Sequence, residues 1–256
     1  MTTDTALIQT LQPEPSARRV QRVRHPLVRR ELKVLRVESP SPKLRSITLS
    51  GPALDGFISA SFDDHLKLLL DVGGPEPVRR DYTPRRYDAA AGELMIEFAV
   101  HGDGPAAAWA AQAAPGQSVA IGGPRGSLVI DLDHDWHLLV GDETALPAIA
   151  RRLDELPAQA TAIVIGQVDE ASEQRQFNTR ATLDLRWVAN AQGVIDALRR
   201  LTLPPGDGFA WCAGEAKAVA AQRRVLVEEL GIGKHAVRAA AYWKLGTSAH
   251  HENLED

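Results

Sequence analysis

The sequence predicts a β-barrel followed by an α/β domain: a six-stranded antiparallel barrel at residues 29–132 and a doubly wound parallel sheet at residues 133–256. Two patterns lead to this prediction. Between residues 31 and 124, short segments alternate apolar and polar residues and are separated by glycine and proline, which is typical of a small antiparallel barrel. After residue 133, apolar segments alternate with helical ones, which indicates parallel βαβ units. The 256 residues are sufficient for two domains with separate cores.

Residues 1–28 precede the first predicted strand and are expected to form a loose N-terminal arm. They mix prolines with arginines and show no periodicity. The basic side chains suit an anionic partner, but a solvated tail has the same composition. The sequence therefore assigns this arm no role.

Six strands and one helix are expected in the barrel. The strands are predicted at residues 31–39, 44–51, 65–72, 79–85, 92–100 and 117–124, and the helix at residues 105–113. Gly102 and Gly104 precede this helix, and Pro105 suits its first turn because a missing N–H costs no hydrogen bond there. The free N–H groups at the helix start would face an anion, and a pyrophosphate fits this place. An ordinary Gly-Pro helix start explains these residues equally well.

The end of the fourth strand, RDYTPR at residues 80–85, combines side chains that suit a flavin nucleotide. In an extended strand Arg80 and Tyr82 share one face, while Thr83 points away or turns inward where the chain bends before Pro84. A flavin ring needs a flat apolar partner and a hydrogen bond near its reactive nitrogen, and a pyrophosphate needs a cation. Tyr82, Thr83 and Arg80 offer these groups in that order. The alternative is an edge strand with a solvated arginine and a packed tyrosine.

The second half alternates strands and helices to the end of the chain. Strands are expected at residues 136–144, 161–168, 183–188, 208–214 and 235–243, and helices at residues 145–156, 194–201 and 215–230. In open sheets of this kind, ligands lie at the carboxyl ends of the strands, which singles out residues 141–144 and 212–215. The G-x-G-x-x-G fingerprint is absent, so we expect a transient nicotinamide cofactor rather than a tightly held one. Arg175, Arg180 and Arg186 could contact a 2′-phosphate, but the sequence does not place them.

Composition narrows the class of protein. A net charge of −4, with 44% hydrophobic and 24% charged residues, predicts no general attraction to nucleic acid or membrane. Cys212 is the only cysteine, which excludes an intrachain disulfide and a cysteine-rich metal site and favours the reducing cytoplasm. The N-terminus lacks the pattern of an export signal, so we expect a soluble cytoplasmic protein without membrane insertion. The oligomeric state is not indicated.

With these elements in place, the chain resembles the siderophore-interacting proteins, the flavin-dependent ferric-siderophore reductases of the ferredoxin-reductase superfamily. The matching strings, in order along the chain, are RDYTPR, VHGDGPAAAWA, PGQSVAIGGPRGS, GDETALPAIARRL, WCAGEA and AYWKLG. Together they are specific, although GPRGS or PGQSV alone would mean little.

The resemblance implies a bound FAD and an electron donor that is NADPH or NADH. It places Arg80 on phosphate, Tyr82 against the flavin and Thr83 near its N5, so Tyr82 and Thr83 become the candidate catalytic residues. The full set of expected cofactor-binding residues is Arg80, Tyr82, Thr83, Arg85, Val100, His101, Gly104, Pro105, Ala106, Trp109, Asp142, Glu143, Thr144, Ala145, Gly214 and Glu215.

A flavin would be needed because a nicotinamide gives two electrons as hydride, whereas Fe(III) accepts one. Siderophore oxygens hold Fe(III) better than Fe(II), so reduction loosens the metal and no protein iron ligand is required. Lys67, Arg125 and Lys244 are the hypothetical contacts to the anionic ferric siderophore, with solvated side chains as the alternative for each.

Two other groups of polar residues are assigned no catalytic or metal-binding role. Asp131, Asp133, His134, Asp135 and His137 suggest metal ligands, but their charges favour a solvated connector between the domains. The polar tail at residues 250–252 is expected to be solvent-exposed.

Two other functions remain open. One is an NAD(P)H-dependent flavin or ferredoxin-type reductase of the same superfamily. The other is a non-catalytic protein that binds flavin or siderophore.

Overall fold

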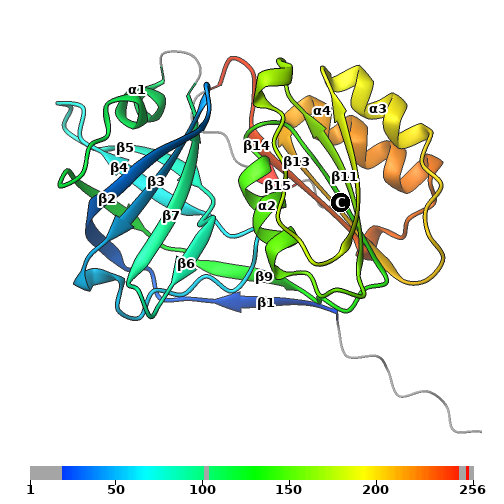
Figure 1. The fold of residues 1–256 in the computed structure, drawn as a ribbon, viewed down its shortest axis with the longest axis horizontal. Helices are drawn as coiled ribbons and strands as arrows, with labels where there is room; N and C mark the ends of the chain where they lie inside the picture. The colour runs from blue at the N-terminus through cyan, green and yellow to red at the C-terminus, as the bar shows by residue number, and fades with distance from the viewer. Residues whose placement is uncertain (1–18, 101–103, 248–251, 254–256) are drawn as a thin grey trace, which may run out of the picture.

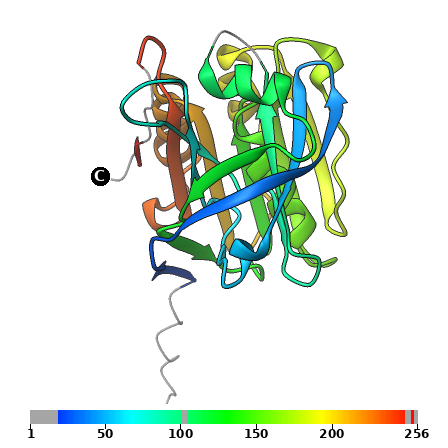
Figure 2. The same ribbon diagram turned by 90° about the vertical axis from the view of Figure 1, so that its left-hand side faces the viewer.

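The computed structural model describes residues 19–100, 104–247 and 252–253. Two domains lie side by side, a barrel-like antiparallel domain and an α/β domain with helices on both faces of its sheet (Figure 1). Turned by a quarter, the molecule shows the barrel strands crossing in front of the second sheet (Figure 2). Within these described ranges, no helix has both the length and the apolar character needed to cross a membrane.

The barrel domain contains a seven-stranded antiparallel sheet with the order β5-β4-β8-β2-β3-β7-β6. Its strands are β2 (Arg29–Ser41), β3 (Leu44–Ser50), β4 (Leu66–Leu70), β5 (Val78–Tyr82), β6 (Arg86–Asp88), β7 (Glu93–Ala99) and β8 (Ser118–Gly122). Six of them match the predicted segments. The seventh, β6, was missed because its three residues follow Pro84 too closely to show an alternating pattern. Alternation does decide which side chains enter the core: Leu66, Leu68 and Leu70 are buried, and Lys67 between them faces outward.

A two-stranded ribbon joins the N-terminal segment to the barrel exit. It consists of β1 (Val20–Arg24) paired antiparallel with β9 (Gly126–Ile130), and it runs along the foot of the molecule (Figure 1). The prediction of a loose arm is therefore wrong for this segment, because a polar sequence such as VQRVR forms a strand only when a partner supplies its hydrogen bonds. Gly126 permits the pairing, since a Cβ there would lie 2.5 Å from the Val23 carbonyl oxygen.

The second domain has a six-stranded sheet with the order β12-β11-β10-β13-β14-β15. The strands are β10 (Trp136–Gly141), β11 (Thr161–Gln167), β12 (Thr182–Val188), β13 (Gly208–Glu215), β14 (Val237–Trp243) and β15 (Glu252–Asn253), of which only β15 pairs antiparallel. The helices of the molecule are α1 (Pro105–Gln112), α2 (Leu146–Glu155), α3 (Ala191–Arg199) and α4 (Ala216–Arg224), with a π-turn at Val225–Glu229 and 3₁₀ turns at Pro52–Leu54, Ala171–Glu173 and Lys234–Ala236. The doubly wound prediction is confirmed.

Two apolar layers cover the parallel sheet, and one of them reaches into the barrel domain. α3 and α4 pack on one face through Val194, Leu198 and Val219. α2 covers the other face, and the same cluster includes Phe62 from the barrel side, whose ring lies 5.4 Å from that of the buried Trp211. Because residues of both domains pack in this one cluster, the seam between the domains is a shared core. Burying one such aromatic side chain stabilises the fold by about 1.5–3 kcal/mol.

The predicted solvated connector at residues 131–137 is wrong for its two histidines. His134 is 4% exposed and His137 is 1% exposed, because the strand β10 begins at Trp136 and carries His137 into the interior. His134 Nδ1 lies 2.9 Å from Arg19 Nη1, so the residue before β1 covers it. Burial, with the nearby positive charge of Arg152 acting in the same direction, lowers the pKa of His137 to about 3.

Candidate active site

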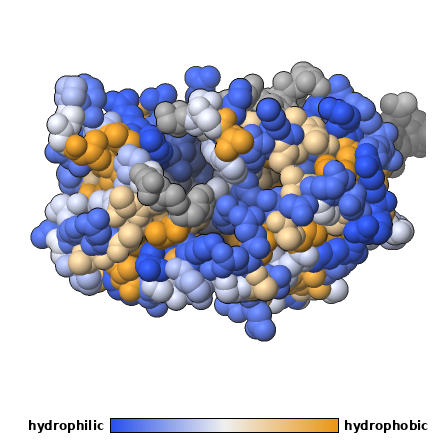
Figure 3. Space-filling view, turned by 90° about the horizontal axis from the view of Figure 1, so that it is seen from above, coloured by the Kyte–Doolittle hydropathy of each residue, from blue (hydrophilic) through white to orange (hydrophobic). Residues whose placement is uncertain are grey.

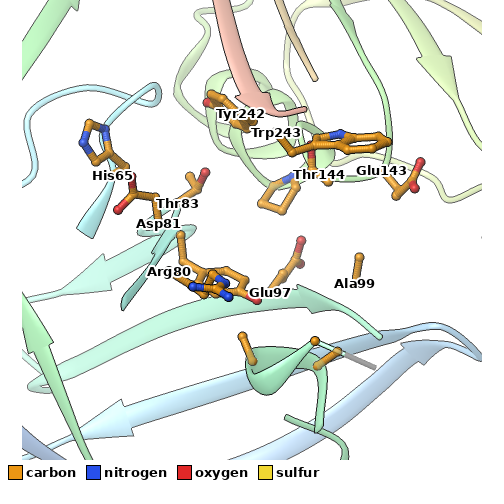
Figure 4. Close-up of a pocket in the computed structure, with 15 residues that line it drawn as sticks. His65, Arg80, Asp81, Thr83, Glu97, Ala99, Glu143, Thr144, Tyr242 and Trp243 are labelled. Carbon is orange, nitrogen blue, oxygen red and sulfur yellow. The ribbon is translucent and has the colours of Figure 1, made fainter. Parts of the chain in front are cut away.

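A cavity of about 300 Å³ lies at the seam between the two domains. Figure 4 shows side chains from the end of β5 on one side and side chains from the second domain on the other. The barrel contributes Arg80, Asp81, Tyr82, Thr83, His65 and Glu97, and the second domain contributes Glu143, Thr144, Tyr242 and Trp243. From above, the space-filling surface is hollowed between the domains and its rim is mainly hydrophilic (Figure 3).

Tyr82 forms an aromatic wall of this cavity. Its ring centroid lies 4.3 Å from that of Phe98, and Phe98 in turn lies 5.5 Å from Trp109 of α1. This row fixes the orientation of the Tyr82 ring. Burial raises the pKa of Tyr82 to about 12, so its hydroxyl stays protonated at neutral pH.

Arg80 and Thr83 lie at the same strand end. Arg80 donates from Nη1 to the neighbouring Arg79 carbonyl at 2.8 Å and faces the cavity. β5 ends at Tyr82, and Thr83 turns inward ahead of Pro84, where it is 7% exposed. Tyr242 lines the same cavity from the second domain and donates from its hydroxyl to Asp63 Oδ1 at 2.9 Å, so the two domains touch near this point.

The start of α1 forms the far end of the cavity. Gly104 is its N-cap, Pro105 is the first helical residue, and no side chain of the residues that the structure describes caps the helix. Ala106 and Ala107 also line the cavity, with their small side chains nearly buried. Because the first N–H groups of a helix have no intrahelical partner, this end offers donors and positive charge to a phosphate.

Other residues predicted near the cofactor lie elsewhere. The guanidinium of Arg85 is 2.7 Å from the Asp154 carboxylate on α2 and 3.9 Å from Glu97, which makes it an interdomain tie rather than part of the cavity lining. Val100 packs against the barrel core. His101 lies outside the described residues.

At the carboxyl edge of the parallel sheet, Asp142 holds three strand ends together. Its carboxylate accepts hydrogen bonds from the Thr144 backbone at 3.0 Å, the Glu215 backbone at 3.0 Å and the Trp243 indole at 2.9 Å. Burial raises its pKa, and these donors oppose that effect. Ala145 is fully buried below it. Of the predicted set on this edge, Glu143 and Thr144 face the interdomain cavity.

Gly214 and Glu215 close the same edge. Gly214 has φ +143°, and a Cβ there would lie 2.4 Å from the Asp142 carboxylate, so only glycine fits. Glu215 accepts at Oε2 from the backbone N–H groups of Lys217 at 2.7 Å and Ala218 at 3.0 Å. The first N–H groups of α4 are thus bound by the chain's own carboxylate.

The three residues predicted to contact the substrate, Lys67, Arg125 and Lys244, lie outside the lining of the seam cavity. Lys67 is half-exposed and forms a 2.6 Å ion pair with Asp81, whose side chain lines the cavity. Arg125 and Lys244 are exposed. None of the three lines the cavity in the part of the chain that the structure describes, so their convergence on a ligand stays a prediction.

Sequence reasoning missed several residues of the cavity. Tyr242 and Trp243 end the strand β14, so the rule that selected the ends of β10 and β13 could have found them. Glu97, which accepts from Arg175 at 2.7 Å across the seam, gave no such signal because β7 reads as an ordinary barrel strand.

Comparison with known families matches both halves of the chain. The model of the siderophore-interacting protein family matches residues 134–246. The model of the siderophore-interacting FAD-binding domain matches residues 33–75 and 71–128.

Individual relatives cover most of the chain. The NADPH-dependent ferric-chelate reductase of Escherichia coli is 40% identical over 87% of this chain and 96% of that protein. The ferric vibriobactin reductase ViuB of Vibrio cholerae is 33% identical over 87% of this chain and 93% of its own length. A crystal structure of a siderophore utilization protein from T. fusca matches with a TM-score of 0.83 and 32% identity, covering 90% of this chain and 98% of that one. Ferredoxin reductases at 15–16% identity share the fold alone.

Proposed function

Because this chain belongs to the siderophore-interacting protein family, we propose that it is an FAD-containing reductase that passes electrons from NADPH or NADH to a ferric siderophore. The observation that carries the proposal is the seam cavity, where the RDYT strand end faces the carboxyl edge of a parallel sheet. Fe(II) would then leave the siderophore in the cytoplasm, the compartment that the single, buried Cys212 favours.

The residues present fit an FAD. Tyr82 offers a rigid aromatic face, Arg80 a cation, and the start of α1, where no described side chain binds the first N–H groups, a second anion-binding group at the other end of the cavity. When bound, the flavin accepts two electrons at once and passes them on singly. In this role Arg80 and the Gly104 backbone would hold phosphate, and Tyr82 would orient the ring.

The opposite wall would receive the nicotinamide. Trp243 is held in place by its indole hydrogen bond to Asp142, and Thr144 by its own bonds to the same carboxylate. These contacts keep the wall rigid, and together with Tyr242 the wall would exclude water from the face of a bound flavin. Thr83, which lines the same cavity as Tyr242, would place its hydroxyl at the reactive edge of the ring.

The ferric siderophore is the substrate and would bind at the outer rim. Lys67, Arg125 and Lys244 are the proposed contacts to its anionic ligand atoms. Since Fe(III) keeps its siderophore ligands until reduction, the chain needs to supply only charge complementarity and access to the flavin edge.

The test starts with the absorbance spectrum of the purified, FAD-reconstituted protein. We expect a flavin spectrum that bleaches anaerobically with NADPH or NADH and recovers on addition of ferric siderophore, with Fe(II) captured by a ferrous chelator. Recovery only with free flavin or ferredoxin would support the related reductase instead. A flavin that stays oxidised with both donors would indicate a binding protein and refute the proposal.

A further inference from the structure

A buried ion pair crosses the seam between the two domains. It joins Asp63 of the barrel domain, whose side chain is 3% exposed, to Arg238 of β14, whose side chain is 9% exposed. Arg238 Nε donates to Asp63 Oδ2 at 3.1 Å, and the other carboxylate oxygen, Oδ1, accepts from the Tyr242 hydroxyl at 2.9 Å. One carboxylate of the barrel domain therefore holds two residues of the second domain.

The chain is held on both sides of Asp63. The preceding residue, Phe62, packs into the apolar cluster of the second domain. The following residue, Asp64, is bound by its own side: its Oδ2 accepts from the Ser127 hydroxyl at 2.8 Å and from the Ser61 backbone at 3.1 Å. Because both neighbours are fixed, Asp63 offers β14 a carboxylate at a defined position.

The two partners of Asp63 lie on one face of β14. Arg238 and Tyr242 are four residues apart, and side chains at even spacing point to the same side of a strand. Ala240 between them packs in the cluster on the barrel-facing side of the sheet. Tyr242 also lines the seam cavity, and Figure 4 shows it on the side opposite Arg80. Asp63 thus reaches the cavity through the Tyr242 side chain.

Two carboxylates hold the end of β14, and they have different effects. Asp142 accepts from the Trp243 indole at 2.9 Å and fixes that ring within its own sheet. The Asp63 contact instead ties Tyr242 to the barrel, the domain that carries the RDYT strand end. The separation of the two cavity walls is therefore governed by the contact between Asp63 and Tyr242.

The chemistry of this pair suits positioning better than stability. Taking two charges out of water is costly, and apolar residues of similar volume often stabilise a fold equally well. Hydrogen bonds to a buried carboxylate, in contrast, fix the direction of their donors. Burial, followed by the negative charge of Asp63, raises the pKa of Tyr242 well above its usual value of 10, so the hydroxyl remains a donor at neutral pH.

We propose that Asp63 is a positioning residue for hydride transfer, and that it acts by holding Tyr242 against the barrel. The inference rests on the proposed function, because it concerns the same cavity and the same step. In that step a hydrogen leaves the nicotinamide with both electrons of its C–H bond, so NAD(P)H becomes NAD(P)⁺ and the flavin gains two electrons. Misplacing one wall by about 1 Å is sufficient to slow such a step by about 100-fold.

The first experiment uses Asp63→Asn and the milder Tyr242→Phe in the FAD-loaded protein. Anaerobic stopped-flow absorbance at increasing donor concentration gives the limiting rate constant of flavin bleaching and the dissociation constant of the donor. We expect the limiting rate constant to fall about tenfold or more in each variant, with dissociation constants within about threefold of the natural chain. Unchanged limiting rate constants, or a loss confined to the dissociation constant, would overturn the inference.

Asp154→Asn is the matched control. It makes the same substitution in another aspartate that pairs with an arginine across the seam, since Asp154 lies 2.7 Å from Arg85. Asp154 is absent from the described lining of the cavity. We expect this variant to lower the free energy of unfolding and to leave the limiting rate constant unchanged. An equal loss of rate in Asp154→Asn would show that any weakening of the seam slows the step, and would refute a special role for Asp63.

The double variant tests whether Asp63 acts through Tyr242. If it does, Asp63→Asn combined with Tyr242→Phe should bleach within about twofold of the slower single variant, because both remove the same contact. Losses that multiply would show that the two residues act independently, which contradicts the inference.

A second readout needs no electron transfer. Quenching of the bound flavin's fluorescence by iodide measures how far the cavity wall shields the flavin. We expect the quenching constant to rise several-fold in Asp63→Asn, and to stay unchanged in Asp154→Asn, which removes the same charge. Equal quenching in both variants and the natural chain would refute the inference. If neither donor bleaches the flavin of the natural chain, the proposed function fails, and quenching still decides whether Asp63 holds the wall in place.

Discussion

Acid should destabilise this protein through His137, and the effect can be calculated. His137 is 1% exposed, and burial lowers its pKa from 6.5 to about 3 in the folded chain. Between these two values the unfolded chain binds a proton that the folded chain does not, so the free energy of unfolding falls as the pH falls. At pH 5 the difference is about 1.5 pKa units, which corresponds to about 2 kcal/mol of lost stability relative to pH 7.

The assay is urea unfolding of the FAD-loaded protein between pH 7 and pH 5 at fixed FAD concentration. We expect His137→Gln to be less stable at pH 7 but to lose about 2 kcal/mol less on acidification than the natural chain. His235→Gln, which removes an exposed histidine, is the matched control and should keep the full pH dependence. Equal pH slopes for the natural chain and His137→Gln would refute the reasoning.

Three further predictions concern the seam. Tyr82→Ala should weaken FAD binding about tenfold, because it removes the aromatic wall, as measured by fluorescence titration of the FAD-free protein; unchanged affinity would place the flavin elsewhere. Gly214→Ala should cost about 1–3 kcal/mol of unfolding free energy and slow flavin bleaching by either donor while the FAD content stays the same; normal bleaching would show that the Asp142 contact is dispensable. Arg85→Met should lower the unfolding free energy by about 1–2 kcal/mol, since the partly buried tie to Asp154 is lost, and no change in denaturant midpoint would argue against that tie.

The sequence predicted what depends on local periodicity. Leu66, Lys67 and Leu68 alternate in the way that β4 uses them, and the apolar segment 136–141 becomes the buried strand β10. Strand ends in a parallel sheet converge by topology, so Glu143 and Thr144 could be assigned to the carboxyl edge of the sheet before any coordinates.

What the sequence could not predict depends on partners far away in the chain. β1 forms because β9 lies beside it and pairs with it, and the local sequence VQRVR does not indicate that such a partner exists. The direction of a side chain is equally non-local: Asp142 turns inward to Trp243, and Arg85 turns to α2 rather than to the seam cavity. His137 was misread for the same reason, since charge alternation in a short stretch does not reveal which residue starts a buried strand.

The carboxylate of Glu215 at the start of α4 has a consequence for the order of events in turnover. A helix start usually retains the pyrophosphate of a dinucleotide, but here a carboxylate already occupies the amide groups of Lys217 and Ala218. A donor nucleotide that gains little from these amides would dissociate soon after giving up its hydride. We therefore expect ping-pong kinetics, in which the spent donor leaves and exposes the reduced flavin before the iron complex arrives.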